Sequence, residues 1–118
     1  MINVLWVALG GALGSAARYG VGVATARWLG AGFPWGTLIV NVAGGLAIGV
    51  LAARTEQADA LRLLLGVGFL GGFTTFSAFS LETVRLMQQR PELGLAYVAA
   101  SLALSVGACW LGLVLGRP

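Results

Sequence analysis

The amino-acid sequence predicts an all-α integral membrane protein, with four transmembrane helices in a single domain of residues 1–118. Of these residues, 58% are hydrophobic and only 9% are charged, and the mean hydropathy is +0.92. A soluble domain needs far more charge on its surface, and a disordered chain combines low hydrophobicity with high net charge. Apolar stretches of about 20 residues, the length that a helix needs to cross the hydrocarbon core, recur along the chain. The expected solvent is therefore the lipid bilayer.

Four spans can be placed in order along the chain. They cover about residues 2–26, 35–53, 61–86 and 94–116. Helix-breaking or polar stretches separate them: Gly30, Gly32 and Pro34 follow the first span, residues 54–59 the second, and residues 87–92 the third. The first three residues carry no basic side chain, so the first span is expected to remain in the mature protein rather than to act as a cleaved signal peptide. Almost no chain is left for a soluble domain, and the function is expected to lie within the membrane.

Positive charge is almost evenly divided between the two membrane faces. The side that holds both termini carries Arg54, Arg62 and Arg117, and the other side carries Arg27, Arg85 and Arg90. Arg18 lies within the first span, nearer to the second side. Because orientation follows the bias of Lys and Arg in short loops, this balance is compatible with insertion in both directions. The alternative is that a partner protein fixes one orientation.

Composition excludes several other functions. The net charge is +3, but the seven basic residues are scattered, so nucleic acid is not an expected partner. Histidine is absent and Cys109 is the only cysteine, which removes His/Cys metal sites and Ser-His triads. The chain has no lysine and hence no Gly-x-x-x-x-Gly-Lys loop for ATP. An enzyme is not expected.

Small residues spaced for close helix packing are frequent. The 19 glycines include four pairs at i and i+4, namely Gly10/Gly14, Gly45/Gly49, Gly68/Gly72 and Gly112/Gly116. Glycines at this spacing let helix backbones approach closely in lipid. Four short helices do not easily enclose a polar path, so some of these faces are expected to meet a second copy.

Two sets of polar residues share a helix face within the spans. Thr37 and Asn41 are four residues apart in the second span, and Tyr97, Ser101 and Ser105 follow the same spacing in the fourth. Polar groups in a bilayer are costly and tend to mark ion paths, and a ladder of neutral donors suits a small anion. The alternatives are interhelical hydrogen bonding for Thr37 and Asn41, back-bonding of the serines to their own helix, and an interfacial position for Tyr97.

The third span contains a run that is unfavourable for a helix, Gly71–Ser80. Two adjacent glycines and then Thr74 and Thr75 predict a break of this span in mid-membrane, which is tolerated where freed carbonyls are buried or coordinate an ion. Beyond it, Phe76 and Phe79 share a face, and the positive edges of their rings are able to solvate an anion. The alternative is a kinked helix with core phenylalanines.

Two charged residues remain within the spans. Arg18 lies in the first span and Glu82 in the third. Both are within about two turns of a predicted helix end, so either side chain is able to reach an interface. A salt bridge between the two helices is a further interpretation.

Taken together, these segments closely resemble the small dual-topology fluoride channels, the Fluc or CrcB proteins. The similarity covers essentially the whole chain and rests on Gly10-Gly11-x-x-Gly14-x-x-x-Arg18-Tyr19, Gly36-Thr37-Leu38-x-Val40-Asn41-x-x-Gly44, Gly71-Gly72-Phe73-Thr74-Thr75-Phe76-Ser77-x-Phe79-Ser80 and Glu82. Departures are small. Ala78 stands where many members have threonine, and Ser15 where alanine is common.

The resemblance implies a fluoride-selective channel for passive export of cytoplasmic fluoride, formed by an antiparallel homodimer in the inner or plasma membrane of a bacterium. It implies a fluoride route along Asn41, Phe76, Phe79, Thr37, Tyr97, Ser101 and Ser105. It also implies a structural Na⁺ at the dimer centre, held by the main-chain carbonyls of Gly71 and Thr74. Arg18 and Glu82 are left as structural or entrance charges.

Two other classes of function stay open at this point. A small multidrug-type proton antiporter also has four helices and dual topology, but it needs a membrane-embedded carboxylate, normally in the first helix. That helix has Arg18 and no acid. A non-transporting assembly subunit leaves the pattern of Asn, Ser, Thr and Phe residues without a purpose.

Overall fold

The computed structural model describes residues 2–54 and 60–118, and all the regular structure in this part of the chain is helical. The elements are α1 (Ile2–Leu29), α2 (Trp35–Arg54), α3 (Ala60–Arg62), the π-helix η1 (Leu63–Leu70), α4 (Gly71–Phe73), α5 (Ser77–Gln89) and α6 (Pro91–Leu115). Four segments are long and apolar enough to cross a membrane: α1, α2, the stretch Ala60–Gln89 and α6. The prediction of four spans is confirmed, and the chain is a multi-pass membrane protein.

The spans extend slightly beyond the predicted ends, for local reasons. α1 continues to Leu29, where Gly30 has a φ of 84° and donates its N–H to the Ala26 carbonyl at 3.1 Å. Glycine adopts this left-handed conformation without a Cβ clash, which makes it a frequent helix terminator. α6 begins at Pro91 rather than at residue 94, because proline suits the first helical turn, where its missing N–H has no partner to lose. The predicted polar residues 55–59 lie outside the described residues.

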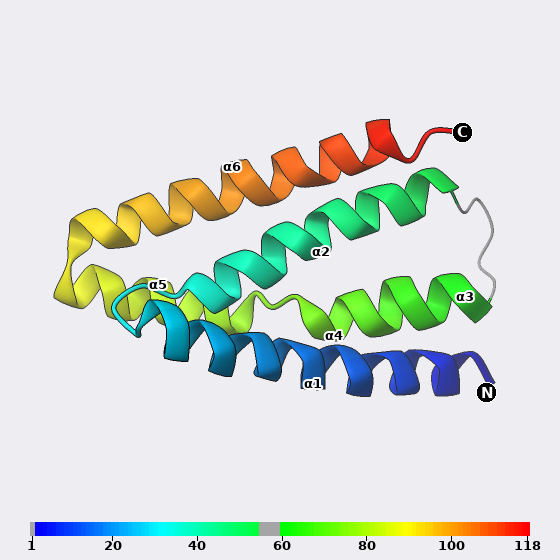
Figure 1. The fold of residues 1–118 in the computed structure, drawn as a ribbon, viewed down its shortest axis with the longest axis horizontal. Helices are drawn as coiled ribbons and strands as arrows, with labels where there is room; N and C mark the ends of the chain where they lie inside the picture. Colours follow the sequence, from blue (N-terminus) through cyan, green and yellow to red (C-terminus); the bar gives the residue numbers. More distant parts are fainter. Residues whose placement is uncertain (1, 55–59) are drawn as a thin grey trace.

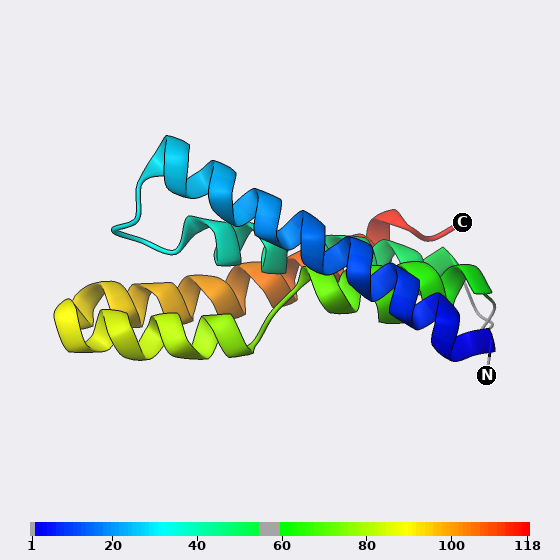
Figure 2. The same ribbon diagram turned by 90° about the horizontal axis from the view of Figure 1, so that it is seen from below.

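The molecule is elongated, with extents of 45 × 28 × 23 Å. Figure 1 shows α6, α2, the third span and α1 in that order across the view, with both termini at the same end. α2 packs along α6, α1 packs along η1 and α4, and α5 packs beside α6. In the turned view of Figure 2, α1 crosses the third span obliquely. α2 and η1 contact each other much less than either contacts its other neighbour.

The predicted glycine pairs pack inside the chain. A Cβ atom on Gly49 of α2 would overlap the Cys109 carbonyl of α6, and one on Gly112 would overlap the Leu46 carbonyl. The same holds for the pairs of α1 and the third span, where Cβ atoms on Gly10 and Gly14 would strike main-chain atoms of the third span. These glycines are therefore packed within one chain, and the contact of some of these faces with a second copy stays a prediction.

The buried core is small. Its apolar members are Leu38, Val40, Leu86 and Tyr97, and Ser101 is the buried polar residue among those described. Most large apolar side chains of the described residues are exposed, as expected where lipid tails and not water surround the helices.

Candidate ion-binding cavity beside the third span

The third span changes conformation between Phe73 and Ser77. Thr74 is extended, with φ −88° and ψ 160°, and α5 begins at Ser77. Thr74 closes the preceding helix, since both its N–H (3.0 Å) and its hydroxyl (2.9 Å) donate to the Leu70 carbonyl. Thr75 opens the next helix, because its hydroxyl accepts the Ala78 N–H at 3.1 Å, and the first N–H groups of a helix lack intrahelical partners. The two glycines before the threonines remain helical.

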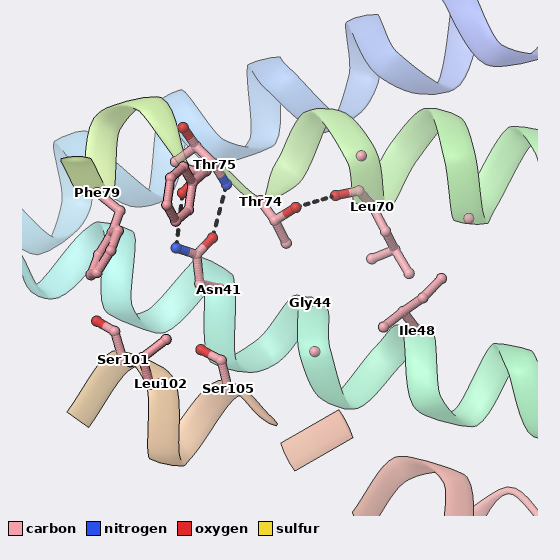
Figure 3. A pocket seen from close by; sticks show the side chains of 14 residues that line it. Asn41, Gly44, Ile48, Leu70, Thr74, Thr75, Phe79, Ser101, Leu102 and Ser105 are labelled. Carbon is pink, nitrogen blue, oxygen red and sulfur yellow. Dashed lines mark hydrogen bonds between the residues drawn. The ribbon is translucent and has the colours of Figure 1, made fainter. Parts of the chain in front are cut away.

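A pair of hydrogen bonds ties this segment to α2. The Asn41 amide donates from Nδ2 to the Thr75 carbonyl at 3.0 Å, and its Oδ1 accepts the Thr75 N–H at 2.8 Å (Figure 3). This is the interhelical role that the sequence left open for Asn41. An amide nitrogen has two N–H groups, so one donor remains beyond this pair, which we call the Asn41–Thr75 clamp.

The clamp also changes the hydrogen bonding of two carbonyls. In a continuous α-helix, the N–H of residue 75 would bond to the Gly71 carbonyl and that of residue 78 to the Thr74 carbonyl. Here Asn41 Oδ1 accepts the first of these N–H groups and the Thr75 hydroxyl accepts the second. Gly71 and Thr74, the residues predicted to bind a cation through their carbonyls, therefore lose their regular helical donors.

An open cavity of about 550 Å³ lies beside this segment, between α2, the third span and α6. Figure 3 shows its lining from close by. Seven of the predicted site residues contribute to it: Asn41, Gly71, Thr74, Phe76, Phe79, Ser101 and Ser105. The sequence pattern thus brings together residues from three spans.

Two hydroxyl groups of the cavity have no partner. Ser101 Oγ and Ser105 Oγ are buried and make no hydrogen bond within the part of the chain that the structure describes. The alternative in which these serines bond to their own helix is therefore not observed. A buried hydroxyl without a partner is costly, so each of these two groups lacks a hydrogen bond that an ion reaching it would supply.

Two phenyl rings flank the same space. Phe76 and Phe79 have ring centroids 5.5 Å apart and ring planes tilted by 43°. Phe76 is 76% exposed, whereas Phe79 packs against Tyr97 at 5.2 Å. The two rings are therefore not both part of the core, because the Phe76 ring is mostly exposed in the isolated chain.

Other predicted site residues lie elsewhere. Tyr97 is fully buried beneath the cavity wall, and its hydroxyl donates to Glu82 Oε1 at 3.2 Å. The Tyr97 ring therefore packs inside the protein and does not face lipid. Thr37 lines two other pockets, one of about 510 Å³ shared with Arg18 and one of about 380 Å³ shared with Glu82.

Arg18 and Glu82 do not pair with each other among the described residues. Arg18 Nε donates to the Gly72 carbonyl at 3.1 Å, and the Glu82 carboxylate accepts the Tyr97 hydroxyl. Arg18 thus fastens α1 to the helix that precedes Thr74. This bond is a positioning contact rather than a salt bridge.

Sequence reasoning used Thr75 only to predict the break of the third span and did not count it among the site residues. Its main chain forms one half of the clamp and its hydroxyl starts α5. Its partner Asn41 is 34 residues away, so no local spacing pointed to the pair. Gly44 was also unassigned, yet a Cβ atom there would overlap the Thr74 side chain.

Residues 5–113 match the family described as CrcB-like protein, Camphor Resistance (CrcB). The chain is 50% identical to a fluoride-specific ion channel FluC of a Caulobacter species, over 99% of this chain and 96% of that protein. It is 51% identical to the protein of the same name from Agrobacterium fabrum, over 99% and 98%, and 52% identical to that from Rhodospirillum centenum, over 99% and 97%. With this identity over nearly its full length, the chain belongs to the CrcB family.

Proposed function

We propose that this protein is a fluoride-specific ion channel that lets fluoride leave the cytoplasm of a bacterium passively across its inner membrane. Relatives that share half of the sequence carry this name. The observation that carries the proposal is the pair of unpartnered hydroxyls, Ser101 Oγ and Ser105 Oγ, in a cavity that also holds two phenyl rings. No lining residue of that cavity in the described chain is charged.

The chemistry of the cavity suits a small, strongly hydrated anion. Such an ion gives up its water only if donors replace it, and the cavity offers two hydroxyls, the remaining N–H of Asn41 and the positive edges of Phe76 and Phe79. Conduction also requires binding weak enough for release. A guanidinium in the cavity would hold the anion tightly, and Arg18 of α1 is instead bonded to the Gly72 carbonyl.

The direction of flow then follows from the membrane. Fluoride enters cells as neutral HF, which dissociates in the cytoplasm. An inside-negative potential favours exit of an anion by about 2.3 kcal/mol per 100 mV. No energy source beyond this potential is required.

The pathway is completed by a second copy in the opposite orientation. Two observations support this antiparallel homodimer. The cavity is open and Phe76 is 76% exposed, and the arginines are divided three and three between the two sides, so neither orientation is favoured. The non-helical segment at Thr74 would then lie in mid-membrane, where exposed backbone requires a protein neighbour.

A structural Na⁺ fits the two carbonyls that lack regular donors. Gly71 and Thr74 of two antiparallel copies would supply four oxygen ligands, the ligand type that hard cations prefer. The ion would fix the dimer centre. Because main-chain atoms are the ligands, Thr74→Ser should keep sodium-dependent dimer stability in a thermal melt, whereas Thr74→Leu, which removes the hydroxyl bond to Leu70, should weaken it. Equal melting temperatures with sodium and with N-methylglucamine would contradict the site.

Fluoride efflux from liposomes tests the function. Vesicles loaded with potassium fluoride and containing the protein should release fluoride only after valinomycin lets potassium follow, since a channel moves net charge. Release should not depend on a pH gradient. Efflux that requires a proton gradient would indicate an antiporter, and efflux equal to that of empty vesicles would indicate a subunit without transport.

A further inference from the structure

A second groove lies on the opposite side of α2 from the ion cavity. It has a volume of about 510 Å³ and is bounded by α2 and η1. Apart from one residue, its lining is apolar, with Ala43, Ala47, Val50, Leu65 and Phe69 among its members. The exception is Arg54, in the last turn of α2. We call this the α2–η1 groove.

The groove and the cavity belong to different faces of the molecule. At about 100° per residue, the α2 residues that line the groove point roughly 140° away from those that line the cavity. Only Leu70 lines both. The space between α2 and η1 is therefore open on two sides, one polar and one apolar.

The α2–η1 groove has no feature that requires a protein neighbour. The cavity side presents an exposed phenyl ring, Phe76, and the non-helical backbone at Thr74, which a second copy would cover. The groove contains no polar side chain among the described residues except the charge at its mouth. If the cavity face is the dimer interface, the groove faces lipid.

The dimensions of the groove match one lipid chain. From Ala43 to Arg54 the helix rises about 16 Å, close to half of the roughly 30 Å hydrocarbon core. Its inner end therefore reaches the bilayer centre near Leu70, and its outer end lies at one interface. Arginine is well suited to a phosphate there, because the planar guanidinium donates two parallel hydrogen bonds.

We propose that the α2–η1 groove binds one acyl chain of an anionic phospholipid, whose phosphate is held by Arg54. The bound chain fills the space that α2 and η1 leave between them. It lies against Leu70, whose carbonyl accepts both hydrogen bonds from Thr74. The lipid thus supports, from the apolar side, the helix end that carries the ion cavity.

Native mass spectrometry of the delipidated full-length protein tests the proposal, with phosphatidylglycerol and phosphatidylcholine as probes. The wild type should retain phosphatidylglycerol about fivefold more strongly, the effect of one arginine near an anionic surface. Arg54→Gln should remove this preference, and Ala47→Phe, which fills the groove, should reduce retention of both lipids. Arg117→Gln and Ala103→Phe, a charge and a surface position outside the groove, serve as matched controls and should behave like the wild type.

Three outcomes would overturn the proposal. One is lipid retention that is the same in Arg54→Gln and Arg117→Gln. Another is retention that is the same in Ala47→Phe and Ala103→Phe. The third is a loss of the dimer peak on size exclusion in Ala47→Phe but not in Ala103→Phe, which would mean that a second copy occupies the groove. Arg54→Gln changes an exposed side chain and leaves packing intact, so it remains informative if Ala47→Phe does not fold.

Discussion

The two sides of α2 are built differently. Against α6, its backbone lies so close that added Cβ atoms on Gly49 or Gly112 would overlap carbonyls of the other helix. Against the third span, α2 touches η1 sparsely, and the clamp between Asn41 and Thr75 bridges the opening. The first side is a continuous backbone contact, and the second depends on a few polar bonds.

This difference separates folding from function. Glycine packing fixes α2 and α6 as a rigid pair, and this pair carries Asn41, Ser101 and Ser105 to one wall of the cavity. The loose side leaves space for an ion, and its few hydrogen bonds set the shape of the opposite wall. Substitutions at the α2–α6 contact should therefore prevent folding. Substitutions between α2 and the third span should instead abolish fluoride flux in a protein that still folds.

The largest effect is expected on the tight side. Gly112→Val would force a branched side chain into the Leu46 carbonyl, and overpacking of this kind costs about 1–3 kcal/mol or more. We expect little folded protein on size exclusion and no fluoride efflux. The matched control is Gly107→Val, where a Cβ atom meets nothing within 4 Å. Equal yields of the two variants would contradict the tight packing.

The next effect should come from the clamp. Asn41→Asp keeps an acceptor for the Thr75 N–H but places an oxygen against the Thr75 carbonyl, so one hydrogen bond becomes a repulsion. Loss of a buried hydrogen bond costs about 1–3 kcal/mol, and we expect efflux to fall roughly 100-fold with the size-exclusion profile unchanged. Asn41→Ser, which retains a donor, should lose less. Faster fluoride efflux from Asn41→Asp than from Asn41→Ser would argue against the clamp.

A smaller effect is expected from the phenyl rings. Phe76→Ile and Phe79→Ile keep apolar bulk but remove the ring edges, whose interactions contribute about 0.5–1.5 kcal/mol each, so efflux should fall about tenfold. Phe73→Ile is the control, because that ring stacks on Phe69 and is not among the residues that line the cavity or the α2–η1 groove. If both cavity variants stay dimeric and conduct like Phe73→Ile, the ring edges do not interact with the ion.

The smallest effect should come from single hydroxyls. Ser101→Ala or Ser105→Ala removes one unpartnered donor and should slow efflux roughly two- to tenfold, the range of one net hydrogen bond. Folding should be unchanged or slightly improved, since no protein partner is left unsatisfied. Ser80→Ala removes a hydroxyl that is already bonded to the Phe76 carbonyl and should leave efflux unaltered.

Much of the fold follows from the sequence because hydrophobic length is a local signal. The four spans were predicted within a few residues, and two of the shifts have local causes, the left-handed Gly30 at the end of α1 and Pro91 in the first turn of α6. The partner of each glycine face could not be predicted. Spacing shows that a face packs closely, but not whether a helix of the same chain or another copy covers it.

The site was predicted less completely than the fold. Spacing on one helix placed Ser101 and Ser105 together and singled out Asn41, Phe76 and Phe79 with structural alternatives left open, and the resemblance assigned all of them to one ion route. The clamp was not predicted, because it joins Asn41 to the main chain of Thr75. Every residue has the same main-chain groups, so the sequence does not indicate which of them binds a side chain. Tyr97 shares the spacing of the serines but packs in the core against Phe33 and Phe79 and bonds to Glu82, since helix periodicity specifies a face and not its neighbour.

The central claim is that the cavity beside Asn41 is the ion path, and two substitutions on α6 test it most directly. Ser105→Leu fills the cavity, whereas Ala103→Leu, two residues away, adds the same side chain at an exposed position. The measurement is valinomycin-triggered fluoride efflux from liposomes, with a size-exclusion profile for each variant. We expect Ser105→Leu to release fluoride no faster than empty vesicles and Ala103→Leu to match the wild type. Wild-type efflux from folded Ser105→Leu would contradict the account.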